Sequence, residues 1–458
     1  MAVKDTGTTC PDIRAARLSR SQIDANFGDM HPALSHSEAL IEADRCYFCY
    51  DAPCTTACPT AIDIPRFIQN IRSDNLISSA QTILNENIMG GMCARVCPTE
   101  VLCEEACVRN AHEDKPVTIG QLQRHATDPV FADNIQLFER AAPTGHRVAV
   151  VGGGPAGLSC AHRLACLGHH VTILNSRDKL GGLNEYGIAA YKATDEFAQR
   201  EVDYILSIGA IDVQNGVALG PDLSLSSLRD QYDAVFLSIG LGGVNELGLG
   251  NENMSGVEDA VEYIAQLRQA EDKSTLLVGR RVLVIGGGMT AIDIATQSKR
   301  LGAQDVTIVY RRGPEQMNAS SHEQHYAQTS GVQIKHWATP TRLLGDGELR
   351  GVEFEYTRLS NGKLESSGDA FILEADVVFK AIGQTVLWNS LGDLAGQVET
   401  KRGRIHVDDN RRTSLADVWA GGDCVFGGDD LTVSAVQDGK LAAVAIDAHL
   451  KGTGETHG

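Results

Sequence analysis

Length, composition and charge already restrict what this protein can be. A chain of 458 residues is too long for one hydrophobic core, and 43% hydrophobic with 22% charged residues is typical of an ordinary soluble globular protein. The formal net charge of −19 disfavours nucleic acid and anionic membrane surfaces as partners. The sequence has no apolar run of about 18 residues, and residues 1–20 lack a signal-peptide core, so we expect a cytoplasmic protein.

The cysteines are concentrated near the N-terminus. Of twelve cysteines, nine precede residue 108, and only Cys160, Cys166 and Cys424 follow. Because no export signal is expected, such a group indicates metal binding or redox chemistry instead of disulfides. The nine are Cys10, Cys46, Cys49, Cys54, Cys58, Cys93, Cys97, Cys103 and Cys107.

The first cysteine block follows a short predicted helix. Residues 1–30 predict an extended or partly helical arm, and residues 36–45 have helical spacing with Ser37 placed to cap the helix. The segment CYFCYDAPCTTACP then gives the spacing C-x2-C-x4-C-x3-C-P from Cys46 to Pro59. Ferredoxin-type proteins use a close relative of this run, in which the fourth cysteine serves the other of two clusters.

A second cysteine block follows residues 60–90, which predict helix. In this block CARVCP leads to Cys103 and Cys107. Two 4Fe–4S clusters need eight ligands, and the two blocks supply eight cysteines without Cys10. Paired C-x2-C units also bind zinc, but zinc sites rarely repeat the C-x3-C-P ending. The spacing therefore favours two iron–sulfur clusters over zinc.

The segment RVAVVGGGPAG, residues 147–157, predicts the turn of a dinucleotide-binding βαβ unit after a linker that ends near residue 143. The first glycine makes the tight turn, the second lets the backbone approach a pyrophosphate, and the third lets the helix pack on the strand. The next strand ends at Asn175, where an acidic residue usually accepts the ribose hydroxyls. A further glycine pair just before Leu183 favours FAD over a free nicotinamide cofactor.

A second dinucleotide unit is predicted at residues 281–291, after a helical segment at 257–269. Alanine takes the third glycine position of this unit, where it still allows close helix packing. The strand that follows ends in Arg311 and Arg312 instead of an acid. Guanidinium groups at this position suit the 2′-phosphate of NADP, because their planar fork matches phosphate oxygens. The alternative is a solvated basic strand end.

The remaining segments complete the two nucleotide-binding units. Residues 332–373 predict antiparallel strands, and residues 375–384 predict a strand that returns to the first unit. Asp423 lies at the end of a further strand beside glycines, and the final helix is expected from about 432 to 450. A carboxylate at this point would hold a ribityl hydroxyl of the flavin, with the helix dipole near the flavin ring.

Together these segments resemble the NAD(P)H-accepting subunits of bacterial dihydropyrimidine dehydrogenases. The chain is also similar to the N-terminal part of the long, mammalian-type enzyme and to the small subunit of glutamate synthase. The resemblance covers about residues 35–450. It is carried by CYFCYDAPCTTACP, CARVCPTEVLCEEAC, VGGGPAGLSCA, GGLNEYGIAAYK, GGGMTAID, VYRRG, KAIGQ and AGGDC.

The fold implied by the resemblance is of the α/β class. It has an N-terminal α-helical double iron–sulfur domain followed by two Rossmann-like domains, for FAD and for NAD(P), of the two-dinucleotide-binding flavoprotein type. We expect the helical 4Fe–4S cluster domain at residues 1–143. A discontinuous FAD-binding domain is expected at 144–256 and 385–458, and the NAD(P)H-binding domain at 257–384.

The resemblance also implies a ligand set for each cluster. One cluster is expected on Cys46, Cys49, Cys54 and Cys107, and the other on Cys58, Cys97, Cys103 and Gln123. Spacing alone nominates Cys93 in place of Gln123. The dihydropyrimidine branch, however, places a glutamine in an I-G-x-L-Q segment, which IGQLQ matches. Gln123 is therefore favoured, and Cys93 is the alternative.

For the nucleotides, the resemblance implies two further sets of residues. The FAD set is Gly152, Gly153, Gly154, Pro155, Ala156, Asn175, Gly182, Leu183, Lys192, Gly422, Asp423 and Thr432. The NAD(P) set is Gly287, Gly288, Met289, Thr290, Arg311, Arg312, Ala381, Ile382 and Gly383. Asn175 departs from the family's acid and loses the charge-assisted hydrogen bond to the ribose. Relatives use NADH or NADPH, so the preference stays open.

The function implied is electron input. Hydride passes from NAD(P)H to FAD, and single electrons leave through the two clusters to an FMN-containing partner subunit, which reduces uracil or thymine to the 5,6-dihydro form. No catalytic acid or base is expected in this chain. The alternatives are the small subunit of glutamate synthase and an electron-transfer subunit of a ferredoxin-linked complex.

A disulfide reductase shares the two-dinucleotide plan but needs a redox cysteine pair beside the flavin. Cys160 and Cys166 fall on the helix after the first glycine turn, which is the wrong place for such a pair. We therefore predict that these two cysteines and Cys424 are packing residues.

Overall fold

The computed structural model describes residues 18–452, so Cys10 and part of the predicted N-terminal arm lie outside the described residues. The described chain forms two compact units. The smaller unit contains residues 18–29, 186–191 and 244–384, and the larger unit contains residues 30–185, 192–243 and 385–452. Residues 186–191 and 244–256 thus lie in the smaller unit, and the predicted domain boundaries stay a prediction.

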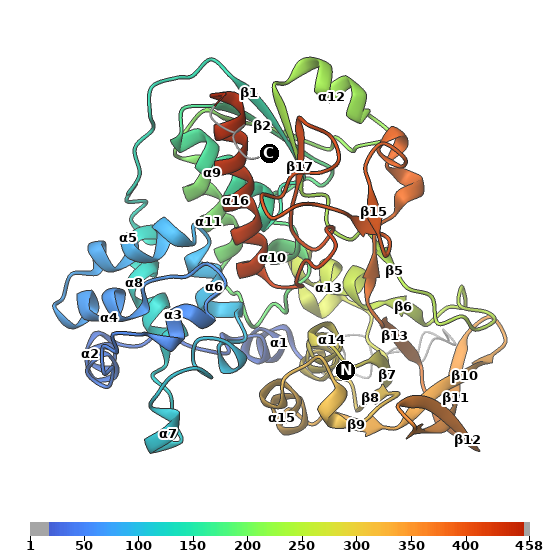
Figure 1. The fold of residues 1–458 in the computed structure, drawn as a ribbon. Helices are drawn as coiled ribbons and strands as arrows, with labels where there is room; N and C mark the ends of the chain where they lie inside the picture. Colours follow the sequence, from blue (N-terminus) through green and yellow to red (C-terminus); the bar gives the residue numbers. More distant parts are fainter. Residues whose placement is uncertain (1–17, 453–458) are drawn as a thin grey trace. The chain divides into compact units, whose positions relative to one another are not determined.

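The N-terminal part of the larger unit is built from short helices, coloured blue to teal in Figure 1. They are α2 (His36–Asp44), α3 (Pro53–Ala57), α4 (Ile64–Arg72), α5 (Leu76–Glu86), α6 (Gly90–Val96), the 3-10 turn η1 (Thr99–Val101), α7 (Asn110–Glu113) and α8 (Ile119–Ala132). The N-cap of α2 is Ser35, and the prediction of Ser37 is wrong. The Ser35 hydroxyl accepts from the Glu38 N–H, and the Glu38 carboxylate accepts from the Ser35 N–H, forming a capping box.

Aliphatic side chains at helical spacing hold these helices together. In α4, Ile64, Phe67, Ile68 and Ile71 are at most 2% exposed and pack with Ile83 of α5. Five of the predicted cluster ligands pack at the edge of this core, namely Cys46, Cys54, Cys58, Cys103 and Cys107. The helical domain thus presents its cysteines to an apolar interior.

A parallel five-stranded sheet is the centre of the other part of the larger unit, in the order β17-β4-β1-β2-β3. Its strands are β1 (Arg147–Val151), β2 (His170–Asn175), β3 (Ile211–Asn215), β4 (Ala234–Leu237) and β17 (Val418–Ala420). Its helices are α9 (Pro155–Cys166), α10 (Leu183–Tyr186), α11 (Phe197–Leu206), α12 (Leu225–Gln231) and α16 (Thr432–Leu450). The order reverses between β1 and β4, and the carboxyl end of the strands at such a point is where open α/β sheets bind ligands.

The last helix, α16, packs closely on α9, the helix that follows the first glycine turn (Figure 1). Gly439 allows the close approach, because a Cβ at this position would overlap the carbonyl oxygen of Ala156. The Ser159 hydroxyl donates to the Val436 carbonyl oxygen at 2.8 Å. The C-terminal segment therefore belongs to the same nucleotide-binding unit as residues 147–157.

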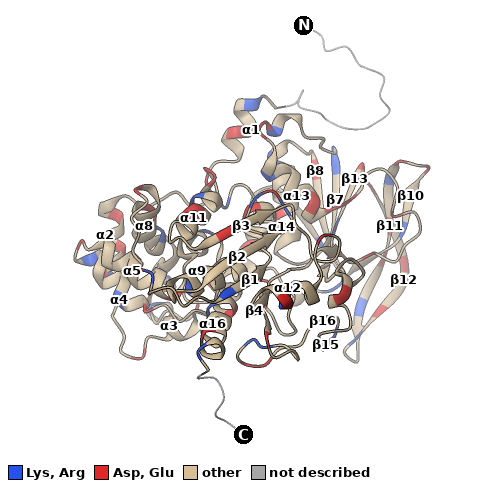
Figure 2. Cartoon of the chain, turned by 90° about the horizontal axis from the view of Figure 1, so that it is seen from above, with Lys and Arg blue, Asp and Glu red and all other residues tan. Residues whose placement is uncertain are grey.

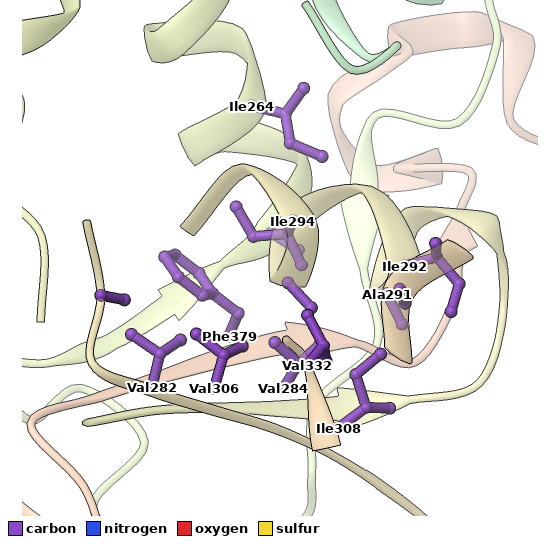
Figure 3. Packing of buried hydrophobic residues seen from close by; sticks show 14 of the residues in the cluster. Ile264, Val282, Val284, Ala291, Ile292, Ile294, Val306, Ile308, Val332 and Phe379 are labelled. Atoms are coloured by element: carbon purple, nitrogen blue, oxygen red, sulfur yellow. The ribbon is translucent and has the colours of Figure 1, made fainter. Parts of the chain in front are cut away.

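The smaller unit contains a second parallel five-stranded sheet, in the order β6-β13-β7-β8-β9. Its strands are β6 (Val257–Asp259), β7 (Arg281–Gly286), β8 (Asp305–Tyr310), β9 (Gln333–His336) and β13 (Val377–Ala381). Its helices are α13 (Ala260–Gln269), α14 (Met289–Leu301) and α15 (Ser321–Thr329). Figure 3 shows the core of this unit, where Val284 of β7, Ile308 of β8 and Ile294 of α14 belong to one buried cluster.

Three sequence predictions are corrected in the smaller unit. Residues 257–259 form a strand before the helix that was expected from residue 257. The strand predicted to return to the first unit, β13, instead lies between β6 and β7. The antiparallel sheet begins at residue 338, because β9 pairs in parallel with β8. That sheet consists of β10 (Ala338–Gly345), β11 (Leu349–Ser360) and β12 (Lys363–Glu374).

Short elements complete the described chain. They are α1 (Arg20–Asn26), β5 (Gly243–Val244), η2 (Lys273–Thr275), η3 (Pro314–Gln316), β14 (Gln384–Thr385), η4 (Trp388–Ser390), η5 (Gly392–Leu394), β15 (Thr400–Lys401) and β16 (Arg404–Ile405). Lys and Arg are interspersed with Asp and Glu along the described elements (Figure 2). None of the helices between residues 18 and 452 has the length and apolar character needed to cross a membrane.

Candidate functional site: two cysteine groups and two glycine turns

One group of cysteines surrounds a pocket in the helical part of the larger unit. The pocket holds about 380 Å³ of space, its opening included. Its cysteines come from the loop after α2, from α3 and from the loop before α7, and they are Cys46, Cys49, Cys54 and Cys107. Apolar side chains, among them Ile64, Ile68, Val117 and Ile119, line the rest of it. The structure thus brings together the four residues predicted for one cluster.

The thiols of this pocket lie close enough to influence one another. Burial, followed by the nearby Cys46, raises the pKa of the Cys54 thiol to about 11. Burial also raises the pKa of the Cys46 thiol, and Cys49 and Cys107 add to this effect. Crowded sulfurs in an apolar wall suit a cationic iron centre, which binds thiolates and offsets their repulsion.

A second group contains Cys58, Cys97 and Cys103, with both candidates for the fourth ligand nearby. The hydrogen bond to Cys93 and burial raise the pKa of the Cys97 thiol well above its ordinary value, and Cys103 and Cys58 contribute. Burial raises the pKa of Cys103 as well, and Glu104 and Cys58 contribute. The three predicted cysteines are therefore near enough to influence the pKa of Cys97, and Cys54 of the first group also influences that of Cys103.

Gln123 and Cys93 lie on facing helices, α8 and α6. Gln123 is 7% exposed, and its Nε2 donates to the Gly90 carbonyl oxygen at 2.6 Å. Cys93 is 3% exposed and lies next to Cys97, as the thiol hydrogen bond shows. The assignment of Gln123 as a ligand stays a prediction.

Thiols are the ligands that hold 4Fe–4S clusters in proteins. No three His, Cys, Asp or Glu side chains between residues 18 and 452 converge closely enough to hold a single metal ion. In a 4Fe–4S cube the four thiolates bind four different irons, so its ligands are more widely spaced than those of one zinc ion. The four thiols around the pocket supply the one sulfur ligand per iron that a cube needs.

The first glycine turn, between β1 and α9, has the geometry of a dinucleotide site. Gly152 has a φ of +104°, and a Cβ there would overlap the Ser238 carbonyl oxygen. A Cβ on Gly157 would overlap the Gly152 carbonyl oxygen. At Gly154, in contrast, the nearest atom to a Cβ would be the Gly182 Cα, at 3.8 Å. The protein itself requires the first and third glycines, whereas the second leaves the open backbone that a pyrophosphate needs.

Other predicted flavin residues lie against this turn. The Gly181 N–H donates to the Gly153 carbonyl oxygen at 2.7 Å, and a Cβ on Gly182 would lie 2.8 Å from the Gly154 Cα. Leu183 begins α10 directly afterwards, and Lys192 is half-buried. The first glycine turn and the Gly181–Gly182 turn are thus packed together, as close approach to one ligand requires.

The side chain of Asn175, at the end of β2, is fully engaged within the protein. Its Oδ1 accepts from the Gly153 N–H at 3.2 Å. Its Nδ2 donates to the carbonyl oxygens of Arg177, at 2.7 Å, and Lys179, at 3.1 Å. A carboxylate could not donate these last two hydrogen bonds, which explains the amide at this position. Its predicted contact with the ribose stays a prediction.

The turn after β17 completes the predicted flavin set. Gly422, with a φ of +86°, donates its N–H to the buried Asp438 carboxylate at 2.8 Å, and a Cβ there would lie 3.4 Å from the Ala156 Cβ. Burial, and after it the neighbouring Asp430, raises the pKa of Asp423 to about 6. Thr432 is the first residue of α16. The structure therefore brings Gly422 to the first turn of α9, next to Ala156.

The second glycine turn, between β7 and α14, repeats the pattern. Gly286 has a φ of +146°, and a Cβ there would overlap the Ala381 carbonyl oxygen. A Cβ on Gly287 would lie 2.5 Å from the Tyr310 ring. A Cβ on Gly288 would meet nothing within 4 Å, and Met289 and Thr290 then open α14. The predicted residues Ala381, Ile382 and Gly383 stand at and just after the end of β13, next to β7.

Arg311 and Arg312 follow the end of β8, the strand next to β7. Arg311 is exposed and Arg312 is half-buried. Neither guanidinium group forms a hydrogen bond or ion pair with another residue of the described range 18–452. The main chain at Arg311 is fixed, because the Thr357 hydroxyl donates to the Arg311 carbonyl oxygen at 2.8 Å. Two unpaired guanidinium groups on a fixed backbone suit an anionic ligand.

Replacing both arginines by alanine is expected to lower kcat/KM for NADPH by about 10- to 100-fold and to leave that for NADH nearly unchanged, because only NADPH carries the 2′-phosphate. Steady-state kinetics with both nucleotides measures this ratio. Arg342→Ala is the control, since Arg342 is exposed in the same unit but pairs with Glu353 at 3.3 Å. An unchanged ratio in the double variant contradicts the phosphate role.

One buried carboxyl group, Glu201 on α11, was not predicted. It is 0% exposed, and its Oε1 accepts from the N–H groups of Gly91, at 2.9 Å, and Met92, at 3.0 Å, in the first turn of α6. Burial raises the pKa of Glu201 to about 8. Glu201 is four residues from both Phe197 and Ile205, which places it on the apolar face of the helix. This spacing is the feature of the sequence from which its burial could have been predicted.

The raised pKa makes folding stability depend on pH. The folded protein keeps the Glu201 proton between about pH 4.5 and about pH 8, where the unfolded chain has lost it, so stability is expected to fall as pH rises through this window. Glu201→Gln keeps an acceptor oxygen but cannot ionise. The difference in unfolding free energy between this variant and wild type should therefore be more favourable to the variant at pH 8 than at pH 5, by a few kcal/mol.

Thermal unfolding of Glu201→Gln and wild-type protein at both pH values measures this difference. Asp203→Asn, on the exposed side of the same helix, is the matched control and should leave the pH dependence unchanged. Parallel pH profiles for wild type and Glu201→Gln would show that the carboxyl group does not titrate in this window.

These features define a two-dinucleotide-binding oxidoreductase with a cysteine-rich helical domain, and comparisons with known proteins identify the family. Residues 137–439 match the model of pyridine nucleotide-disulphide oxidoreductases, and residues 23–135 match that of dihydropyrimidine dehydrogenase domain II, 4Fe-4S cluster. The chain therefore belongs to the pyridine nucleotide-disulphide oxidoreductase family. It is an NAD(P)H-dependent oxidoreductase whose cofactors are FAD, NAD(P)H and 4Fe–4S clusters.

Full-length relatives narrow the family further. The chain is 35% identical to an NAD-dependent dihydropyrimidine dehydrogenase subunit PreT homolog of Salmonella typhi, over 92% of this chain and 97% of the relative. It is 32% identical to the glutamate synthase [NADPH] small chain of Escherichia coli, over 92% of this chain and 93% of the relative. Among solved structures, Mycobacterium tuberculosis FprA in complex with NADPH aligns with a TM-score of 0.56 at 16% identity, covering 68% of this chain and 87% of that protein.

The predicted family and fold class are thereby confirmed. The cysteines of the nucleotide-binding parts do not support the alternative of a disulfide reductase, which needs a redox cysteine pair beside the flavin. Cys160 is buried in α9, Cys166 ends the same helix, and burial raises the pKa of Cys424 to about 12. A thiol with so high a pKa is inert, as expected of a packing residue.

Proposed function

We propose that this protein is the electron-input subunit of an NAD(P)H-dependent dihydropyrimidine dehydrogenase. The observation that carries the proposal is the presence of two glycine turns and two cysteine groups in a chain that is 35% identical, over 92% of its length, to a relative that bears this name. When bound, FAD accepts a hydride from NAD(P)H and the 4Fe–4S clusters carry single electrons onward.

The residues of the chain bind and orient these groups. The open backbone at Gly154 and Gly288, each just before a helix, supports pyrophosphate binding at the two helix N-termini. Arg311 and Arg312 would hold a 2′-phosphate, and Asp423 a ribityl hydroxyl. We assign Cys46, Cys49, Cys54 and Cys107 to one cluster, and Cys58, Cys97, Cys103 and Gln123 to the other. No residue is needed as a proton donor for hydride transfer.

The electrons are proposed to leave for a second polypeptide. The elements of residues 18–452 build the cysteine-rich helical part and the two nucleotide-binding sheets with their helices and short flanking strands, and we assign none of them to pyrimidine reduction. We propose an FMN-containing catalytic subunit in a cytoplasmic hetero-oligomer, with uracil or thymine reduced to the 5,6-dihydro form.

A second candidate is the small chain of a glutamate synthase, which the 32% identity to the Escherichia coli protein favours. Co-expression with each FMN-containing partner, followed by anaerobic NAD(P)H oxidation, separates the two. We expect turnover that depends on uracil or thymine. Turnover with glutamine and 2-oxoglutarate alone would favour the second candidate, and reduction of ferredoxin alone would favour a ferredoxin-linked complex.

A further inference from the structure

A buried threonine stands beside one of the proposed cluster ligands. Thr60 is 0% exposed, and its Oγ1 lies 3.4 Å from the Sγ of Cys58. Among residues 18–452, this sulfur is the only hydrogen-bond partner of the hydroxyl. A buried hydroxyl without an acceptor costs about 1–3 kcal/mol, so the contact with sulfur determines how Thr60 is oriented.

The direction of this hydrogen bond follows from the chemistry of the sulfur. A cysteine that ligates iron is a thiolate and has no proton to donate. The Thr60 hydroxyl is then the donor, and the bond is charge-assisted. Reduction adds negative charge to the cluster and its sulfurs, so this donor stabilises the reduced form more than the oxidised form. Hydrogen bonds to sulfur ligands are a recognised determinant of cluster potential.

Lys440 of α16 fixes the main chain at Thr60. Its Nζ donates to the carbonyl oxygens of Thr60 and Glu86, both at 3.2 Å, and to the Glu86 carboxylate at 2.8 Å. Thr60 is therefore held at two points, its hydroxyl by Cys58 and its main-chain carbonyl by a lysine on the helix that packs against α9. Because the main chain is fixed, less conformational entropy is lost when the hydroxyl bonds the sulfur.

We propose that Thr60 is a positioning residue that raises the reduction potential of the cluster bound by Cys58, through a hydrogen bond from its hydroxyl to the ligating sulfur. The inference rests on the assignment of Cys58 as a cluster ligand in the proposed function. Thr60→Val keeps the shape of the side chain but removes the donor. It is expected to lower the equilibrium constant for reduction of this cluster by about threefold to tenfold, a tenfold change being 59 mV for a one-electron couple.

A mediated redox titration of the purified holoprotein, followed by the EPR signals of the reduced clusters, measures this shift. Thr60→Ser retains the hydroxyl and should titrate as wild type. Thr56→Val is the matched control, because Thr56 is exposed and lies two residues on the other side of Cys58. An unchanged potential in a Thr60→Val protein with full iron content overturns the inference.

Iron and acid-labile sulfide contents of the same preparations separate this inference from the proposed function. Wild-type protein without iron would contradict the proposed function itself, whereas iron-loaded variants with equal potentials contradict only the role of Thr60. If Thr60→Val loses the cluster, the reduction potentials of Thr60→Ser and Lys440→Met are measured instead. The inference then requires that Thr60→Ser has the wild-type potential and that Lys440→Met has a lower one, and any other pattern overturns it.

Discussion

Replacing Cys58 by alanine is expected to remove one iron–sulfur cluster and to stop electron delivery to a partner, while NAD(P)H still reduces the flavin. Cys58 follows Cys54 in the first cysteine block, but it is absent from the residues that line the pocket of Cys46, Cys49, Cys54 and Cys107. Cys58 contributes to the raised pKa of both Cys97 and Cys103 of the second block, whereas Cys54 contributes only to that of Cys103. Neighbouring cysteines should therefore serve different clusters.

The measurement compares Cys58→Ala with Cys54→Ala. Each variant should lose about half of the iron, and the two should lose different EPR signals, because a cluster needs all of its ligands. Partner-dependent turnover should fall by more than about 100-fold in both, while flavin reduction by NAD(P)H followed by absorbance persists. Cys166→Ala, at the end of α9, is the control that keeps both signals. Loss of the same EPR signal in both variants would refute the division of the block.

Alanine at Gly154 is expected to leave the protein folded but to prevent FAD binding. Gly154 has an ordinary φ of −81°, and a Cβ there would meet no atom closer than 3.8 Å. Nothing within the protein therefore requires glycine at this position. A methyl group at the N-terminus of α9 would, however, occupy the space into which a pyrophosphate has to approach the backbone. We expect FAD affinity to fall by at least about 100-fold, or about 3 kcal/mol.

Gly152→Ala provides the contrast, because it combines a φ of +104° with a Cβ that overlaps the Ser238 carbonyl oxygen. This variant should lose both FAD and folding stability, by about 2–4 kcal/mol. Flavin content after purification and the thermal unfolding of flavin-free protein measure the two effects separately. Full flavin content in Gly154→Ala would show that the dinucleotide does not approach this turn, and a loss of stability equal to that of Gly152→Ala would show a structural role instead.

The local features of this fold could be predicted from the sequence because they depend on neighbouring residues. The glycine turns are fixed by strand, turn and helix within about a dozen residues, and the roles expected of Gly152, Gly154 and Gly157 match what a Cβ at each would meet. The cap of α2 was misassigned although the sequence contained the correct signal. Ser35 and Glu38 have the S-x-x-E spacing of a capping box, whereas Ser37 has no such partner.

Long-range pairing was harder to predict. The apolar run of β13 is compatible with either parallel sheet, and only its pairing with β6 and β7 decides between them. Residues 257–259 are too short a strand for periodicity to separate from the helix that follows. Thr60 and Glu201 carry no motif, and some of the groups that bond them, such as Lys440 and Gly91, come from segments far away in the sequence. These long-range partners become visible only once the chain has folded.

The strand order of the larger unit has a consequence for how the protein is made. β4 lies between β1 and β17, and β17 is synthesised only after the whole of residues 244–384. On the ribosome the smaller unit can therefore fold before β17 is made. During this time the edge of β4 that pairs with β17 has no partner strand. An exposed strand edge promotes association between chains, so nascent molecules of this protein are most prone to aggregate in the interval before Val418–Ala420 emerges.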